Sequence, residues 1–145
     1  MIETFADFEA LVRDTVFANA TAEMLFCFEL TNDDDASENA AGPLLKQDQD
    51  FFLFETDITG TRRTAISTIA NRRAEGELLI SLFTKDKGDP IGRKRRLEQV
   101  GAWFADMTVG GVRFRTLQPT GSGPLMGFRT YDAVIPCDFE LKRMR

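Results

Sequence analysis

The sequence predicts an α+β fold: a single mixed or antiparallel sheet of about five or six strands, with two helices packed on one face. Two segments, 4–18 and 90–109, place apolar residues at helical spacing. The apolar run 77–84 and the alternating segment 112–117 flank the second helix, as strands would. With 145 residues, the chain fits one domain over 1–145 that is long enough to bury a core.

The N-terminal part predicts a helix followed by a strand. Thr4 and Asp7 have the spacing of a capping box, with Asp in place of the preferred Glu. Segment 24–30 is apolar on nearly both sides, so we expect a strand that is central or covered by a helix. The apolar stripe of the helix consists of Phe5, Phe8, Leu11, Val12 and Val16.

Segment 31–50 predicts a long, solvated, acidic loop. It lacks apolar periodicity and contains a run of like charge, namely Asp33, Asp34, Asp35 and Glu38. Loops of this length in small domains are usually functional or mobile. We do not expect a calcium-binding EF-hand loop here, because the Gly and the final Glu are missing at their required spacing.

Segment 51–56 predicts a strand, 59–61 a turn, and 62–70 the returning partner strand. Arg72 and Arg73 lie at the end of this partner strand. They are either solvated charges that discourage unwanted edge pairing or contacts to an acidic partner or to phosphates.

The second helix begins with a strongly basic turn. Asp89 is a suitable N-cap, Pro90 suits the first helical position, and Gly110–Gly111 ends the helix. Cations at a helix start oppose the helix dipole, which favours a contact to an acidic protein face or nucleic acid; a merely solvated face is the alternative. The basic residues of this turn and of the loop before it are Lys85, Lys87, Arg93, Lys94, Arg95 and Arg96.

The C-terminal part predicts a turn region over 118–124 and one long strand, or a bulged pair, over 125–141. Pro136 places that part of the strand on an edge or at a bulge, because proline cannot donate to a ladder. The expected core is Phe8, Leu11, Val12, Phe26, Phe28, Leu53, Ile80, Leu82, Leu97, Val100, Phe104, Phe114 and Val134.

The composition argues against an enzyme. The chain has no histidine, and its two cysteines, Cys27 and Cys137, fit buried free thiols; a disulfide is the alternative. We therefore expect no catalytic residue, no metal and no cofactor. The net charge of −5 argues against general nucleic-acid binding, and the sequence suggests no signal peptide and no membrane span.

Three stretches resemble the tail-terminator (tail-completion) proteins of long-tailed bacteriophages. They are 76–83, the helix end Gly101-Ala102-Trp103-Phe104, and the closing strand 131–136 after a Gly- and Pro-containing turn. The resemblance implies a structural virion protein of the tail or neck, made in the host cytoplasm. It implies a ring, usually a hexamer, that caps the tail tube, ends its polymerisation and joins the head–tail connector while DNA passes through the lumen. The family supplies no catalytic residues, and the acidic loop is not a family feature.

The charges suggest how such a ring could assemble, because a closed ring needs complementary surfaces on each subunit. We expect the basic start of the second helix to contact a neighbouring subunit or the tail-tube protein. The acidic loop would face the lumen or the connector. The alternatives are another neck component, such as a head-closure or adaptor protein, or a monomeric ligand-binding α+β domain with a Phe-rich pocket.

Overall fold

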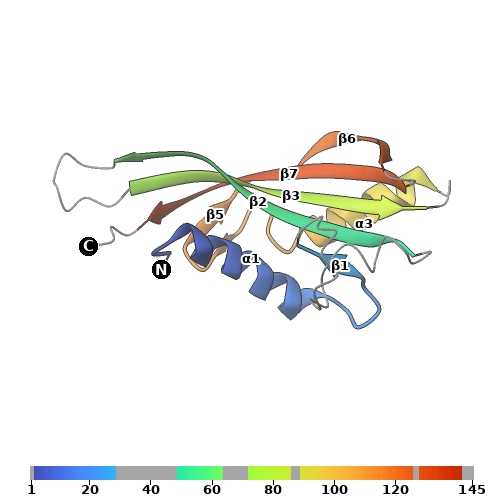
Figure 1. Cartoon of the computed structure of the whole chain (residues 1–145), viewed down its shortest axis with the longest axis horizontal. Coiled ribbons are helices and arrows are strands. Elements are labelled where there is room, and N and C mark those ends of the chain that lie inside the picture. The colour runs from blue at the N-terminus through green and yellow to red at the C-terminus, as the bar shows by residue number, and fades with distance from the viewer. Residues whose placement is uncertain (1, 29–48, 64–71, 86–88, 126–127, 142–145) are drawn as a thin grey trace.

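A computed structural model describes residues 2–28, 49–63, 72–85, 89–125 and 128–141. These residues form two helices and one seven-stranded sheet, which confirms the predicted α+β class (Figure 1). The helices are α1 (Phe5–Asn19) and α3 (Pro90–Gly101). The strands are β1 (Phe26–Cys27), β2 (Phe51–Arg63), β3 (Arg72–Thr84), β4 (Thr108–Val109), β5 (Val112–Phe114), β6 (Gln118–Leu125) and β7 (Phe128–Leu141).

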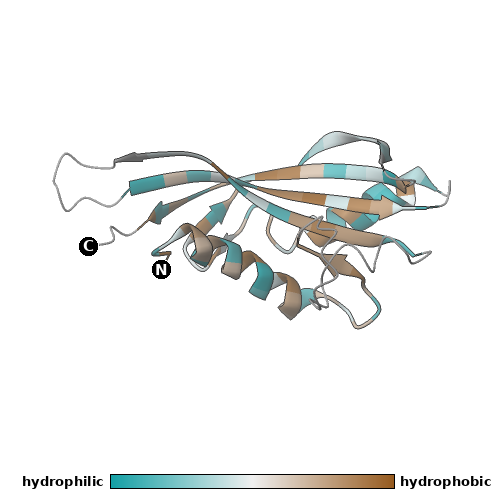
Figure 2. Cartoon of the chain, viewed as in Figure 1, coloured by the Kyte–Doolittle hydropathy of each residue, from teal (hydrophilic) through white to brown (hydrophobic). Residues whose placement is uncertain are grey.

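The long strands β2, β3 and β7 form the centre of the sheet. The order of the whole sheet is β1-β2-β3-β7-β5-β4, with β6 also paired to β7. β3 and β7 are antiparallel over thirteen registered pairs, from Arg72 opposite Leu141 to Thr84 opposite Arg129. β1 is parallel to β2, so the sheet is mixed. In Figure 1, β2 and β3 extend together beyond α1. The start of β3 is hydrophilic and its second half is hydrophobic (Figure 2).

Both helices pack on one face of this sheet, which we call the helix face. Side chains alternate between the two faces of a strand, so Phe54, Ile80 and Ala133 point towards the helices and join one apolar core. The helices contribute Phe8, Val12 and Val16 from α1 and Leu97 and Val100 from α3. Of the thirteen expected core residues, Leu11, Phe26 and Val134 are only partly buried, and Leu53 joins a second cluster.

That second apolar cluster lies on the opposite face, which we call the open face. Phe51 and Phe83 are registered partners whose rings stack with centroids 4.7 Å apart, and Phe128 meets both rings edge-on. Cys27 belongs to this cluster, whereas Cys137 belongs to the core on the helix face. Both cysteines are buried and neither forms a disulfide, as the sequence predicts.

α1 confirms the predicted capping box. The Asp7 amide donates to Oγ1 of Thr4 at 3.2 Å, and the Thr4 amide donates to Oδ2 of Asp7 at 2.9 Å. These two hydrogen bonds satisfy amides that the first helical turn leaves without partners. The pKa of Asp7 is lowered because the backbone amides of Thr4 and Glu3 donate to its carboxylate. Phe5, expected in the buried stripe, is 47% exposed.

The predicted turn at 59–61 is wrong. β2 continues through it to Arg63, and a register shift between Ile58 and Gly60 absorbs one extra residue. A bulge of this kind keeps both flanking segments paired with β3. Arg62 and Arg63 therefore end β2 instead of starting its partner, and residues 64–70 of that predicted strand lie outside the described part of the chain.

The second helix ends earlier than predicted. α3 stops at Gly101, and Met107 is 48% exposed instead of facing the core. Gly110 and Gly111 do not end the helix: both have positive φ, at 56° and 89°, and connect Val109 to its registered partner in β5. Two central residues with positive φ are typical of a tight hairpin turn, so these glycines join β4 and β5.

The predicted turn region 118–124 is strand β6, and the long strand predicted from residue 125 is β7, starting at Phe128. β6 tolerates Pro119 because it pairs only with β7 among the described strands, which leaves its outer edge without a ladder. The prediction that Pro136 lies on an edge or at a bulge is wrong: it lies in the interior strand β7, in unbroken register with β3, between the part paired with β6 and the part paired with β5. The Pro136 carbonyl accepts a hydrogen bond from the Arg115 amide at 2.8 Å. In an antiparallel strand the N–H and C=O of one residue point to the same side. The N–H that proline lacks would therefore point into the gap between the parts of β7 paired with β6 and with β5.

Candidate functional site

The predicted basic segment occupies the start of α3. Asp89 caps the helix, because its Oδ1 accepts a hydrogen bond from the Ile91 amide at 3.0 Å. A Cβ atom at position 92 would lie 2.9 Å from Oδ2 of Asp89, so Gly92 leaves the room that the capping carboxylate needs. Residues 93–96 therefore fall on the first two turns of a well-defined helix.

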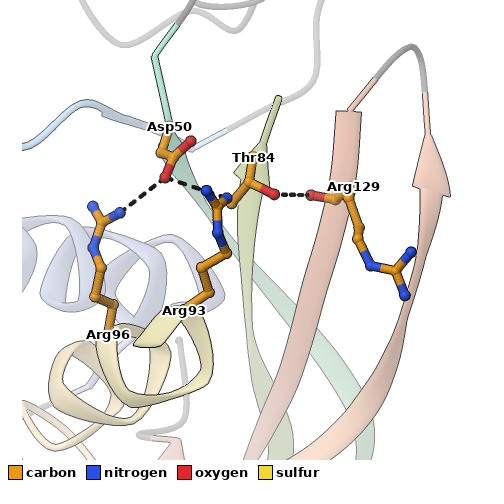
Figure 3. A network of polar contacts seen from close by, with 5 residues as sticks. All are labelled: Asp50, Thr84, Arg93, Arg96 and Arg129. Atoms are coloured by element: carbon orange, nitrogen blue, oxygen red, sulfur yellow. Dashed lines mark hydrogen bonds and ion pairs between the residues drawn. The ribbon is translucent and has the colours of Figure 1, made fainter. Parts of the chain in front are cut away.

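Two of the four basic residues are engaged within the subunit. Nη1 of Arg96 lies 3.0 Å from Oδ2 of Asp50, and Nη1 of Arg93 lies 3.5 Å from the same oxygen (Figure 3). The Arg93 side chain is only 11% exposed, and the Arg96 guanidinium lies 5.6 Å from the ring centroid of Phe52. This Asp50 clasp fixes α3 to the residue that precedes β2.

The other two basic residues point into solvent. Lys94 and Arg95 are exposed, and Ile91, three and four residues earlier, is 62% exposed. Residues at these spacings lie on one side of a helix. We call Ile91, Lys94 and Arg95 the basic turn: two cations beside an apolar side chain, on a helix that the Asp50 clasp holds in place.

Arg72 and Arg73 lie far from the basic turn. They start β3, whereas α3 follows the other end of this thirteen-residue strand, about 40 Å away at ~3.3 Å per residue. Arg73 forms an ion pair with Asp138, and Nη2 of Arg115 donates to Oδ1 of Asp138 at 3.2 Å. The Asp138 side chain is 5% exposed. Arg72 is exposed. The predicted basic residues thus form two separate groups, and this Asp138 clasp was not expected from the sequence.

Of the remaining predicted residues, the structure describes one, Lys85. Lys85 is exposed, and its ammonium group lies 5.2 Å from the ring centroid of Phe128, at the apolar cluster of the open face. This distance suits a cation–π contact. Lys87 and the acidic loop residues Asp33, Asp34, Asp35 and Glu38 lie outside the described residues.

The open face carries an acidic group that the sequence alone does not predict. Glu55 and Asp57 of β2 and Glu75 and Glu77 of β3 share this face, and Asp57 is the registered partner of Glu77. Burial raises the pKa of Glu55. Leu79, Val134 and Pro136, which are partly exposed, continue the same rows of the sheet. We call these four carboxylates and three apolar residues the acidic face. The spacing of two residues between the carboxylates of each strand is visible in the sequence, but only the pairing register places the carboxylates of the two strands side by side.

Two grooves border these surfaces. A groove of about 270 Å³ between α3 and β6 has Leu97, Leu117 and Tyr131 in its lining, together with Lys94 and Asp132. A second groove, of about 460 Å³, runs beside β4 and β5 and is lined in part by Arg113 and Arg115.

Reactive groups are few in the part of the chain that the structure describes. Burial raises the pKa of the Cys137 thiol to about 12, which leaves it protonated and a poor nucleophile. Among the same residues, no group of three or more His, Cys, Asp or Glu side chains could hold a metal ion. None of the described helices has the length and apolar character needed to cross a membrane.

Comparison of the chain with protein-family models and with curated proteins finds no match.

Proposed function

We propose that this protein is a structural virion protein of a long-tailed bacteriophage. It forms a homo-oligomeric ring, most simply a hexamer, that caps the tail tube, ends tube polymerisation and joins the tail to the head–tail connector. Its partners are other copies of itself, the tail-tube protein and the connector. Genomic DNA passes through the lumen without sequence-specific binding. Its place is the tail or neck of the virion, after assembly in the host cytoplasm.

The observation that carries this proposal is the exposed basic turn. Cations on the first turns of a helix oppose the helix dipole, and only Arg93 and Arg96 have the Asp50 carboxylate beside them to compensate. Lys94 and Arg95 lie on the same turns of the helix and are exposed. A contact to an acidic protein surface gives these two cations a role that helix stability does not.

The net charge of −5 supports a protein partner over a nucleic-acid partner for this turn. It also suits a ring through which DNA moves, because negative surfaces repel phosphates. The alternative function, that of a ligand-binding domain, is supported by the groove between α3 and β6, which has Leu97, Leu117 and Tyr131 in its lining.

The test reverses the charge of the exposed pair in the phage that encodes the protein. Lys94→Glu/Arg95→Glu is expected to abolish joining of tails to heads, because like charges would then face each other across the contact. The variant should keep the wild-type circular dichroism spectrum and thermal stability, since both side chains are exposed.

The matched control, Lys94→Arg/Arg95→Lys, keeps both charges and should give normal virions. Normal virions from the charge-reversed variant would contradict the proposal. Binding of a small apolar ligand by a protein that never joins tails would favour the ligand-binding domain.

A further inference from the structure

The acidic face has the features of a surface that a binding partner covers. Among the described residues, the helices pack only on the other side of the sheet. Leu79, Val134 and Pro136 nevertheless give this face a partly exposed apolar centre. The carboxylates of β2 and β3 lie beside that centre in the same rows of the sheet.

The carboxylates work against the stability of the isolated subunit. Asp57 is directly opposite Glu77, and like charges in this position repel each other. Burial also raises the pKa of Glu55, which means that its charged form is disfavoured where it lies. Local conflicts of this kind are expected at functional surfaces. A cationic partner would relieve both of these conflicts.

We propose that the acidic face receives the basic turn of a second copy of this chain, so that each subunit inserts its α3 turn onto the sheet of its neighbour. This inference rests on the proposed function, because it identifies the contact that would build the ring.

The two surfaces complement each other in charge and in polarity. The basic turn offers Lys94 and Arg95 beside the apolar Ile91, which is 62% exposed. The acidic face offers four carboxylates beside an apolar centre. Ile91 would cover that centre, while the two cations pair with the carboxylates from β2 and β3.

The position of the surfaces determines the symmetry of the contact. The basic turn belongs to a helix on the helix face, and the carboxylates lie on the open face. One subunit therefore carries both halves of the contact on opposite sides of its sheet. Such a head-to-tail interface repeats from copy to copy, and it yields a ring when the rotation closes.

A charge-exchange experiment tests this contact directly. The turn variant is Lys94→Glu/Arg95→Glu, and the face variant is Glu55→Lys/Asp57→Lys/Glu77→Lys. Each alone places like charges on both sides of every contact, so its self-association should weaken by about 100-fold or more. An equimolar mixture restores opposite charges at every contact when the two variants alternate. Sedimentation velocity should then detect assemblies with an even number of subunits.

The controls separate this inference from the proposed function. Lys94→Arg/Arg95→Lys should assemble like the wild type, and thermal melts should show that both charge-reversed variants are folded. If each variant alone assembles as the wild type does, or if the mixture stays dissociated, the turn-to-face contact is wrong and a ring must use other surfaces. If the wild-type protein stays a monomer both alone and on tail tubes, the proposed function fails with it.

Discussion

The two clasps use the same chemistry at opposite ends of the sheet. In each, one aspartate lies between two arginines: Asp138 between Arg73 and Arg115, and Asp50 between Arg93 and Arg96. They differ in burial, because the Asp138 side chain is 5% exposed and that of Asp50 is 24% exposed. They also differ in what they join. The Asp138 clasp links strands within the sheet, whereas the Asp50 clasp joins a helix to the start of a strand.

This difference assigns the two clasps different roles. A buried carboxylate without its cations carries a large desolvation penalty, so the Asp138 arginines are committed to the fold. A more exposed ion pair contributes little energy and is screened by salt. The Asp50 clasp therefore serves mainly to orient α3, and with it the exposed Lys94 and Arg95. Arg73 thus belongs to the Asp138 clasp, while Lys94 and Arg95 remain exposed on α3.

The largest effect is expected at the Asp138 clasp. Arg73→Met/Arg115→Met would leave the carboxylate buried without a cation from either arginine, which should reduce the free energy of unfolding by about 3 kcal/mol. Urea denaturation at neutral pH measures this loss. Arg72→Met is the matched control: it lies next to Arg73 in β3 but its side chain is exposed, so its effect should stay within about 0.5 kcal/mol. A loss below about 1 kcal/mol in the double variant would remove the energetic distinction between the clasps.

A smaller effect is expected at the Asp50 clasp. Arg96→Met should reduce the free energy of unfolding by about 1 kcal/mol, because the Arg96 side chain is 47% exposed and Arg93 still pairs with Asp50. The difference from the wild type should shrink as salt rises from about 0.05 M to 0.5 M, since the screening length falls below about 5 Å. Denaturation at both salt concentrations measures it. A salt-independent loss as large as that of the Arg73/Arg115 variant would make the two clasps equivalent.

The smallest effect concerns Glu55, which lies along β2 between the two ends. Burial raises its pKa above the ordinary value of 4.5. Its protonated form is thus favoured in the folded state; this stabilisation is present below the unfolded pKa and is lost as pH rises through the folded pKa.

Glu55→Gln removes this dependence. The variant should therefore gain stability relative to the wild type as pH rises from about 4.5 upwards, by a fraction of a kcal/mol because Glu55 is exposed. Urea denaturation across a pH series measures the gain. A wild-type protein that gains stability over the variant in this pH range would show that a cation within the subunit already compensates Glu55.

The parts of the fold that the sequence predicts well depend on local interactions. Thr4 and Asp7 form the capping box, and Asp89 caps α3 where the sequence places it. These interactions span two to four residues, so the order of residue types is enough to identify them. The turns at 59–61 and 118–124 were mistaken because Gly and Pro are also tolerated at bulges and at the edge of a sheet. Pairing with β3 and β7 decides between these outcomes, and that pairing is not local.

The same distinction between local and non-local interactions applies to the candidate surfaces. Residues 93–96 are continuous in sequence, so the sequence predicts them as one basic group. The sequence does not predict the clasps, because Arg96 and Asp50 are 46 residues apart and Arg115 and Asp138 are 23 residues apart. The acidic face depends on the register that places Asp57 opposite Glu77. No periodicity within one strand predicts that juxtaposition.

The proposed head-to-tail contact would assemble copies of this chain into a ring that caps tail tubes. Negative-stain microscopy of the purified wild-type protein, alone and mixed with tail tubes from the same source, tests it most directly. We expect closed rings, or caps at the ends of tubes. A small monomer that leaves tube ends bare under both conditions would contradict it.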